Sequence, residues 1–365
     1  MKFDSICVDG SSIKYKEYVY IIESKLNALF RTNIKTGETE YLISLKCKKK
    51  EELYRDAYLY KNYAWFIPWM AEQILCINLD TLDCKYYDIP YGKLNEKDIA
   101  YSVFTYFFSS VMLNEKMIFC IPTGTDTAIL IDMEQQKIIK YEGIVDVDRE
   151  NFAYGACDKE WIYMSPYSGD RMVAINYITG KTKEYPWIYS CKEYSGMTCS
   201  NGKLWFAPNK ADNMLVFDLQ EAKFEKIPLG EVYNSEFNYL DIFVHNEILW
   251  ILPWWSKGIL LYDIKTKKWK FREKDAEICW YYDTELRKVH TDDKIMFVSC
   301  RTGYISIYDE ENDKFDNIPV KVDFDGMRDK IDISAVAESH SYSDYRYAEK
   351  YLGLEKYVQI INQYY

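Results

Sequence analysis

Short apolar runs alternate with polar turns along most of this 365-residue chain. The clearest pair of runs, residues 195–199 and 203–207, flanks Asn201-Gly202, which is the strongest short signal for a hairpin turn. Pro208 ends the second run, because proline has no amide proton for a continuing strand. These residues predict two antiparallel strands joined by a tight turn.

Two more runs complete this unit. Residues 214–217 end at Asp218, whose short carboxylate suits a tight turn, and residues 223–227 end at Pro228. Four short antiparallel strands in about 45 residues are the size of one blade of a β-propeller. The pattern therefore predicts an antiparallel sheet made from one continuous segment.

The unit recurs along the chain, and two positions ten residues apart mark every copy. The first is Pro, or its replacement, at the end of the second strand, and the second is Asp or Asn at the end of the third. Copies follow one another at intervals of 42 to 54 residues, which is typical of a rigid unit joined by loops of variable length. The pairs are Glu23/Asn33, Pro68/Asn78, Pro122/Asp132, Pro166/Asn176, Pro208/Asp218, Pro253/Asp263 and Ser299/Asp309.

From these copies we predict an all-β fold, a seven-bladed β-propeller with four antiparallel strands per blade, over residues 1–320. Its first strand is predicted at residues 4–8 and its last at residues 314–318, which would make blade one from one continuous segment. Residues 321–365 are predicted to form a C-terminal extension that is helical from about residue 343, where Ser343 is placed to cap a helix. This helix would pack on the propeller or be presented to a partner.

The second strands share an aromatic-rich ending, as in Trp65-Phe66-Ile67-Pro68 and Trp205-Phe206-Ala207-Pro208. Over residues 3–320 the repeat resembles kelch and related propeller repeats, with Pro near the place of the kelch double glycine. Residues 205–208 and 175–185 are also similar to repeats of the streptogramin B lyase group. The resemblance implies a propeller fold. The activity of the lyase group is associated with a histidine and glutamate cluster at a metal-assisted site, and no equivalent cluster can be assembled from this sequence.

Composition narrows the classes of partner and compartment. With 48% hydrophobic and 17% aromatic residues, the chain has ample material for a core. Its formal net charge is −11, whereas nucleic-acid binding needs a dense basic surface. The sequence contains no apolar run of about 18 residues that would span a membrane, and its ten cysteines include no CxxC pair. We therefore expect a cytoplasmic protein with no nucleic-acid partner and no membrane span.

The sequence offers few candidates for catalysis. His245 and His290 fall at predicted turns between strands one and two, at the opposite end of a blade from the loops after Pro, and His340 lies outside the repeats. No GxSxG, P-loop, HExxH or dinucleotide motif occurs. We expect no catalytic residue, no metal and no cofactor, and hence a non-catalytic recognition module. The alternative is a carbohydrate-active or lyase-type enzyme, or a glycan-binding protein, that uses the same rim and the central channel of the propeller.

The loops after the Pro positions and the segments between blades are predicted to share one rim, and loops on a rigid scaffold commonly carry binding function. Aromatic residues on them resemble a recognition surface, and an arginine fork matches a carboxylate or phosphate group. A protein or peptide partner is predicted first, and a glycan or glycan precursor second. The predicted ligand-binding residues are Trp69, Tyr167, Arg171, Trp254, Trp255, Trp280, Arg301 and Tyr304.

Overall fold

The computed structural model describes most of the repeat region and divides the chain into two compact units. The first unit is Met1–Asp88 with Arg287–Tyr365, and the second is Ile89–Leu286. The described residues are 11–23, 26–46, 54–69, 71–93, 107–146, 150–190, 193–234, 238–253, 256, 258–273, 286–289, 294–299, 304–323 and 330.

Three sheets form the first unit, and each contains four consecutive strands. Blade one contains β1 (Ser12–Tyr15), β2 (Tyr18–Glu23), β3 (Ala28–Asn33) and β4 (Glu38–Ser44), with β29 (Lys321–Val322) added at its edge. Blade two contains β5 (Tyr54–Tyr60), β6 (Tyr63–Pro68), β7 (Gln73–Asn78) and β8 (Cys84–Asp88). Blade seven contains β25 (Leu286–Val289), β26 (Met296–Ser299), β27 (Tyr304–Asp309) and β28 (Lys314–Pro319).

The second unit contains four sheets of the same design. Blade three is β9 (Phe107–Asn114), β10 (Met117–Pro122), β11 (Ala128–Asp132) and β12 (Lys137–Tyr141). Blade four is β13 (Asn151–Asp158), β14 (Trp161–Ser168), β15 (Arg171–Asn176) and β16 (Thr182–Pro186). Blade five is β17 (Tyr194–Ser200), β18 (Lys203–Pro208), β19 (Asn213–Asp218) and β20 (Lys223–Pro228). Blade six is β21 (Tyr239–His245), β22 (Ile248–Pro253), β23 (Gly258–Asp263) and β24 (Lys268–Glu273).

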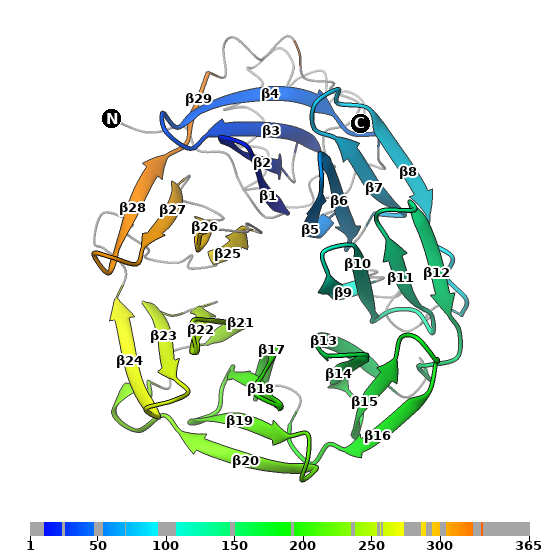
Figure 1. The fold of residues 1–365 in the computed structure, drawn as a ribbon, viewed down its shortest axis with the longest axis vertical. Helices are drawn as coiled ribbons and strands as arrows, with labels where there is room; N and C mark the ends of the chain where they lie inside the picture. Colours follow the sequence, from blue (N-terminus) through cyan, green and yellow to red (C-terminus); the bar gives the residue numbers. More distant parts are fainter. Residues whose placement is uncertain are drawn as a thin grey trace, which may run out of the picture. The chain divides into compact units, whose positions relative to one another are not determined.

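These sheets are the blades of a seven-bladed β-propeller, so the predicted fold with four antiparallel strands per blade is confirmed. In the second unit the first strands of the four blades, β9, β13, β17 and β21, follow one another along one side of the sheets (Figure 1). Hydroxyl groups join neighbouring blades there: Ser109 Oγ donates to the carbonyl of Ala153 at 2.7 Å, and Thr123 Oγ1 donates to the carbonyl of Phe152 at 2.7 Å. These bonds make this unit a firm support for its loops.

The positions ten residues apart are confirmed as strand ends. Each described second strand ends at its Pro or at the residue in its place, except β14, which continues to Ser168. The acidic or amide side chain then caps the next turn, as expected for Asx residues. In blade five, Asp218 Oδ1 accepts the amides of Gln220 at 2.9 Å and Glu221 at 3.0 Å. The bond from the Glu221 amide is the main cause that lowers the pKa of the Asp218 carboxyl.

Blades two to six share a feature that the sequence analysis missed. An aromatic residue at or next to the start of the first strand pairs with the Pro of the second strand, and a β-bulge lies at this pair or one pair further along. A bulge bends the strand and increases its twist, so the same distortion recurs beside the loop that follows each Pro. The pairs are Tyr54/Pro68, Phe107/Pro122, Phe152/Pro166, Tyr194/Pro208 and Tyr239/Pro253.

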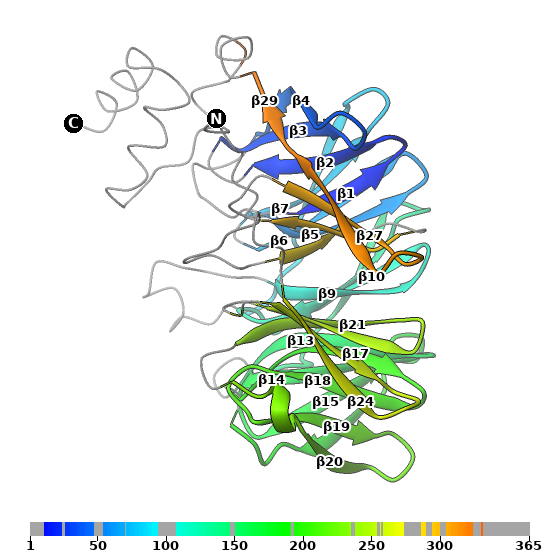
Figure 2. The same cartoon turned by 90° about the vertical axis from the view of Figure 1, so that its left-hand side faces the viewer.

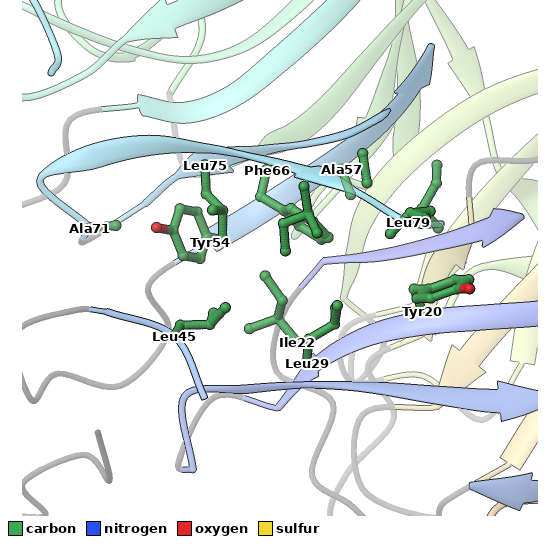
Figure 3. Close-up of a cluster of buried hydrophobic side chains, with 13 residues drawn as sticks. Tyr20, Ile22, Leu29, Leu45, Tyr54, Ala57, Phe66, Ala71, Leu75 and Leu79 are labelled. Carbon is green, nitrogen blue, oxygen red and sulfur yellow. The ribbon is translucent and has the colours of Figure 1, made fainter. Parts of the chain in front are cut away.

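Large apolar side chains fill the space between blades one and two. Figure 3 shows Tyr54, Phe66 and Leu75 of blade two facing Ile22 and Leu29 of blade one. All five side chains are buried, and the rings of Tyr54 and Phe66 meet edge to face with centroids 6.2 Å apart. Burying a side chain of this size contributes about 1.5–3 kcal/mol, which explains why large apolar residues recur at the same blade positions.

Blade one differs from the prediction in two ways. Its first strand is β1, residues 12–15, instead of residues 4–8, which lie outside the described residues. The hypothesis that this blade is made from one continuous segment is also wrong, because β29 pairs in parallel with β4, Lys321 with Glu38 and Val322 with Thr39. Figure 2 shows the chain passing from β28 to the edge of blade one, where β29 lies beside β4.

The C-terminal helix that the sequence predicts from about residue 343 lies outside the described residues. Within the described ranges, helical structure is confined to the short 3₁₀ turn η1 (Gly230–Val232) after blade five. In the part of the chain that the structure describes, no helix is long and apolar enough to cross a membrane.

Candidate binding surface

Exposed large apolar side chains are concentrated on one set of loops. Among the described residues they are Tyr91 (47% exposed), Tyr167 (58%), Ile178 (62%), Ile188 (78%) and Tyr233 (42%). Tyr167 follows Pro166, whereas Tyr91, Ile188 and Tyr233 lie on segments that leave one blade for the next. Ile178 is the exception, because it lies in the turn between β15 and β16, at the other end of its blade.

Backbone hydrogen bonds join the loops around blades four and five. The amide of Trp187 donates to the carbonyl of Asp170 at 2.8 Å, which fixes the segment leaving blade four against the loop after β14. In blade five, the amide of Leu229 donates to the carbonyl of Asp212 at 3.0 Å in the same way. The amide of Glu193 donates to the carbonyl of Ser190 at 3.0 Å, and the carbonyl of Glu193 accepts the amide of Asn209 at 2.8 Å, so the segment leaving blade four is joined to the loop after β18 of blade five. We call residues 167–170, 187–190, 193, 209–212 and 229–234 the loop surface.

Aromatic side chains support the middle of the loop surface. Trp187 is buried, and its ring meets those of Tyr194, Phe206 and Phe224 edge to face, with centroids 5.3 to 6.5 Å apart. The Tyr194 hydroxyl donates to Asn213 Oδ1 at 2.7 Å, so its polar end is satisfied. Ile188, the next residue after Trp187, therefore stands exposed on a packed base.

Arg171, a predicted ligand-binding residue, is held by carboxylates of this chain. Its Nε donates to Glu150 Oε2 at 2.7 Å, its Nη2 to Glu150 Oε1, and its Nη1 to Glu184 Oε1. Glu150 is only 4% exposed, and its hydrogen bonds are the main cause that raises the pKa of Arg171 still higher. The arginine fork is therefore occupied by a structural ion pair.

The other predicted site residues have different positions. In the first unit, Trp69 is half-buried beneath the Arg55 guanidinium, whose carbon lies 4.0 Å from the ring centroid. Tyr304 begins β27, pairs with Pro319 and is also half-buried. Tyr167, in the second unit, lies on the loop surface with its side chain exposed. The remaining four, Trp254, Trp255, Trp280 and Arg301, lie outside the described residues.

Charged side chains on the loop surface are mainly acidic. Asp170, Asp212 and Glu231 are exposed, and Glu193 is half-buried. Lys210 is an exposed cation beside them. Asp212 Oδ1 accepts a hydrogen bond from Asn213 Nδ2 at 2.7 Å. The surface thus combines exposed apolar anchors with carboxylates that face solvent.

The described residues contain no group of three or more His, Cys, Asp or Glu side chains arranged to hold a metal ion. His245 ends β21 at the turn into β22, as predicted, and its Nε2 lies 3.1 Å from Asn246 Nδ2. His290 and His340 lie outside the described residues.

Comparison with known proteins supports the fold. No family model and no curated protein matches the sequence. Among solved structures, a streptogramin B lyase is similar with a TM-score of 0.61 and 12% identity, covering 82% of this chain and 93% of the lyase. A catalytically inactive virginiamycin B lyase from Staphylococcus aureus with quinupristin has a TM-score of 0.58 and 14% identity, covering 81% and 94%. At such identities the similarity shows the propeller fold alone.

A third similar structure is YCF48 bound to D1 peptide, with a TM-score of 0.56 and 10% identity over 82% of this chain and 91% of YCF48. The resemblance to streptogramin B lyase-like propellers that the repeats indicated is thus confirmed at the level of the fold.

Two exposed residues, Tyr91 and Ile188, were missed from sequence. Ile188 lies between Trp187 and Tyr189 in a run whose members are all apolar or aromatic. Nothing in that run shows which side chain turns inward. The position relative to Pro is more informative. The residue directly after the Pro that ends the fourth strand is buried in both blade four (Trp187) and blade five (Leu229), so the residue after it, Ile188 in blade four, could have been expected to be exposed.

Proposed function

We propose that this chain is a recognition module that binds a peptide segment of another protein through the loop surface. The observation that carries the proposal is the exposure of Tyr167, Ile188 and Tyr233 on loops that hydrogen bonds tie together. Exposed apolar groups gathered on one face commonly mark an interaction site. A partner that covers them removes apolar area from water.

The exposed anchors would supply a large part of the binding free energy. Full burial of one side chain of the size of Ile188 contributes about 1.5–3 kcal/mol. Tyr167 and Tyr233 each offer a ring for apolar contact and a hydroxyl for a hydrogen bond, which is why tyrosine is common at interfaces. Three such anchors together contribute roughly 4.5–9 kcal/mol before the entropic cost of association is subtracted. Micromolar affinity, about 8 kcal/mol of net free energy, therefore also requires hydrogen bonds and further contacts along the peptide.

A propeller of similar fold supports the choice of ligand class. YCF48, whose solved structure is similar to this chain, is bound to a D1 peptide. A propeller scaffold of this kind can therefore hold a peptide. The similarity concerns the fold, so the residues that bind in this chain rest on its own exposed loops.

The test uses a phage-displayed library of random 12-residue peptides, selected on the purified full chain. Peptides that bind the parent are then measured against Ile188→Asp. We expect their affinity to fall about 10- to 100-fold, because the anchor is replaced by a hydrated carboxylate. Ile178→Asp is the matched control, since it changes another exposed isoleucine, 62% exposed against 78% for Ile188, at the other end of blade four, and it should leave affinity unchanged.

Both variants must give the circular dichroism spectrum and denaturation midpoint of the parent. If every selected peptide binds Ile188→Asp as tightly as the parent, the loop surface is not the binding site. Selection of no peptide at all against the parent would count against a peptide ligand.

The predicted site at Trp254 and Trp255 is tested with the same peptides. These residues follow Pro253, the Pro that ends the second strand of blade six. We expect Trp254→Ala/Trp255→Ala to remain folded and to weaken a subset of the selected peptides. If the double variant retains every interaction of the parent, these two tryptophans serve packing.

A further inference from the structure

We infer that the peptide segment bound by the loop surface is basic as well as apolar; this inference rests on the proposed function. The apolar anchors share their loops with acidic residues. The backbone carbonyl of Asp170 accepts the amide of Trp187, the residue before Ile188, and the backbone carbonyl of Asp212 accepts the amide of Leu229, two residues before Glu231. These bonds hold the backbones of Asp170 and Asp212 next to the segments that carry Ile188 and Tyr233, and the acidic side chains of Asp170, Asp212 and Glu231 are exposed.

These carboxylates are not neutralised by the chain itself. In the described part of the chain, Asp170, Glu193 and Glu231 take part in no ion pair. Arg171, the residue after Asp170, is bound by Glu150 and Glu184 instead. Lys226 lies over the ring of Tyr189, with Nζ 5.1 Å from the centroid. Lys210 is the exposed cation that remains on this surface.

The opposite end of the same blades has a different character. Its turns carry exposed lysines next to exposed glutamates, as at Lys159-Glu160, and Glu221 forms an ion pair with Lys223 at 4.0 Å. Acidic and basic groups compensate one another there. The excess of carboxylates around apolar anchors therefore distinguishes the loop surface from the described turns at the opposite end of blades four and five.

Complementary charge mainly sets specificity and the rate of association. A peptide whose aliphatic or aromatic side chains cover Ile188, Tyr167 and Tyr233 would place flanking Lys or Arg residues near Asp170, Asp212 and Glu231. An acidic peptide of the same shape would meet like charges. This reverses the expectation from sequence, where Arg171 and Arg301 favoured an acidic ligand group.

The test continues from the peptides whose binding needs Ile188. We expect these peptides to be enriched in Lys and Arg relative to the unselected library. Each is synthesised as selected, with Lys and Arg changed to Gln, and with them changed to Glu. Fluorescence anisotropy should give affinities in that descending order, and the affinity of the basic form should fall at least about threefold when NaCl is raised from about 50 to about 300 mM.

Protein variants locate the charge effect. Asp170→Asn/Asp212→Asn keeps the backbone acceptors and the Oδ1 atoms, and it should weaken the basic peptide about three- to tenfold and leave its Gln form unchanged. Glu160→Gln/Glu221→Gln, at the opposite end of the blades, is the matched control and should have no effect.

The outcomes separate the two proposals. Peptides that need Ile188 but are neutral or acidic, or that bind the Asn variant as tightly as the parent, overturn the charge inference and leave the proposed function standing. If no peptide depends on Ile188, the proposed function fails, and the charge inference fails with it.

Discussion

Gly37 is the residue whose replacement most directly tests the attachment of β29 to blade one. It ends the turn Asn33-Ile34-Lys35-Thr36-Gly37 with φ at +74°, and its amide donates to the carbonyl of Asn33 at 2.8 Å. A Cβ at this position would lie 2.0 Å from the carbonyl oxygen of Pro319. The carbonyl of Gly37 also accepts the amide of Lys321 at 2.8 Å, so the glycine contacts both the end of β28 and the start of β29.

Gly180 is a matched control. It ends the equivalent turn Asn176-Tyr177-Ile178-Thr179-Gly180 with φ at +71°, and its amide donates to the carbonyl of Asn176 at 2.8 Å. A Cβ there would meet nothing within 4 Å. Gly180→Ala therefore measures the cost of the left-handed backbone alone, about 1–2 kcal/mol.

Gly37→Ala carries the same backbone cost and an additional one. The methyl group must push the Pro319 carbonyl away by more than an ångström, which breaks the bond from Lys321 and disturbs Val320, a buried residue of the core between blades one and seven. A lost hydrogen bond is worth about 0.5–1.5 kcal/mol and partial loss of a buried valine adds about 1 kcal/mol or more. We expect a total loss of about 3–5 kcal/mol.

The assay is urea unfolding followed by tryptophan fluorescence, with the unfolding free energy taken from the midpoint and slope. Hydrogen exchange at the Lys321 amide gives a second measurement, which should accelerate in Gly37→Ala and stay unchanged in Gly180→Ala. If the two variants lose the same free energy within about 0.5 kcal/mol, β29 does not stabilise the fold and the reasoning is refuted.

Two further predictions concern buried polar groups. Arg171→Met should lower the unfolding free energy by about 3–5 kcal/mol, because it leaves the buried Glu150 carboxylate unpaired. Arg31→Met frees the exposed Glu40 and removes the guanidinium from the Tyr18 ring, whose centroid lies 4.8 Å away, so it should lower the unfolding free energy by only about 1–2 kcal/mol in the same urea assay. Equal losses in the two variants would contradict the structural role of the Glu150 pair. Burial raises the pKa of Cys76 and Cys199 to about 12, so their stabilising contribution is complete below the unfolded thiol pKa of about 8.5 and declines as pH rises towards 12. The urea midpoint should therefore fall between about pH 8.5 and 10.5, and it should fall less in Cys76→Ala/Cys199→Ala; an equal fall in parent and variant would assign the effect to other groups.

The strand ends that could be predicted from sequence are those set by local chemistry. Pro208 ends a strand wherever it occurs, because it lacks a donor, and Asp218 caps the turn with its own side chain, so both act within a few residues. The first strand of blade one was predicted at the wrong residues because these local signals are missing there. Its turn depends on Lys16 at φ +54°, which carries no Asn-Gly signal, and Glu23 stands in the place of Pro.

The candidate surface was only partly predictable, because exposure and charge pairing are properties of the folded chain. The post-Pro loops were expected to carry binding residues, and Tyr167 is exposed on one of them. Arg171 looked available from sequence, yet its partner Glu150 lies 21 residues earlier, on the segment between two blades. The register of β13 with β14, which pairs Asn151 with Ser168, places Glu150 beside the turn that leads into β15, where Arg171 begins the strand.

Acidic side chains of the loop surface are exposed because the loops are anchored through their backbones. The carbonyl of Asp170 holds the amide of Trp187, and the carbonyl of Asp212 holds that of Leu229, so both loops are fixed through their backbones. The side chains of Asp170 and Asp212 are exposed, whereas Trp187 and Leu229 are buried. A surface whose backbone is already ordered loses little further entropy when a partner binds. Side-chain changes such as Asp170→Asn should for this reason alter affinity for a ligand without altering stability.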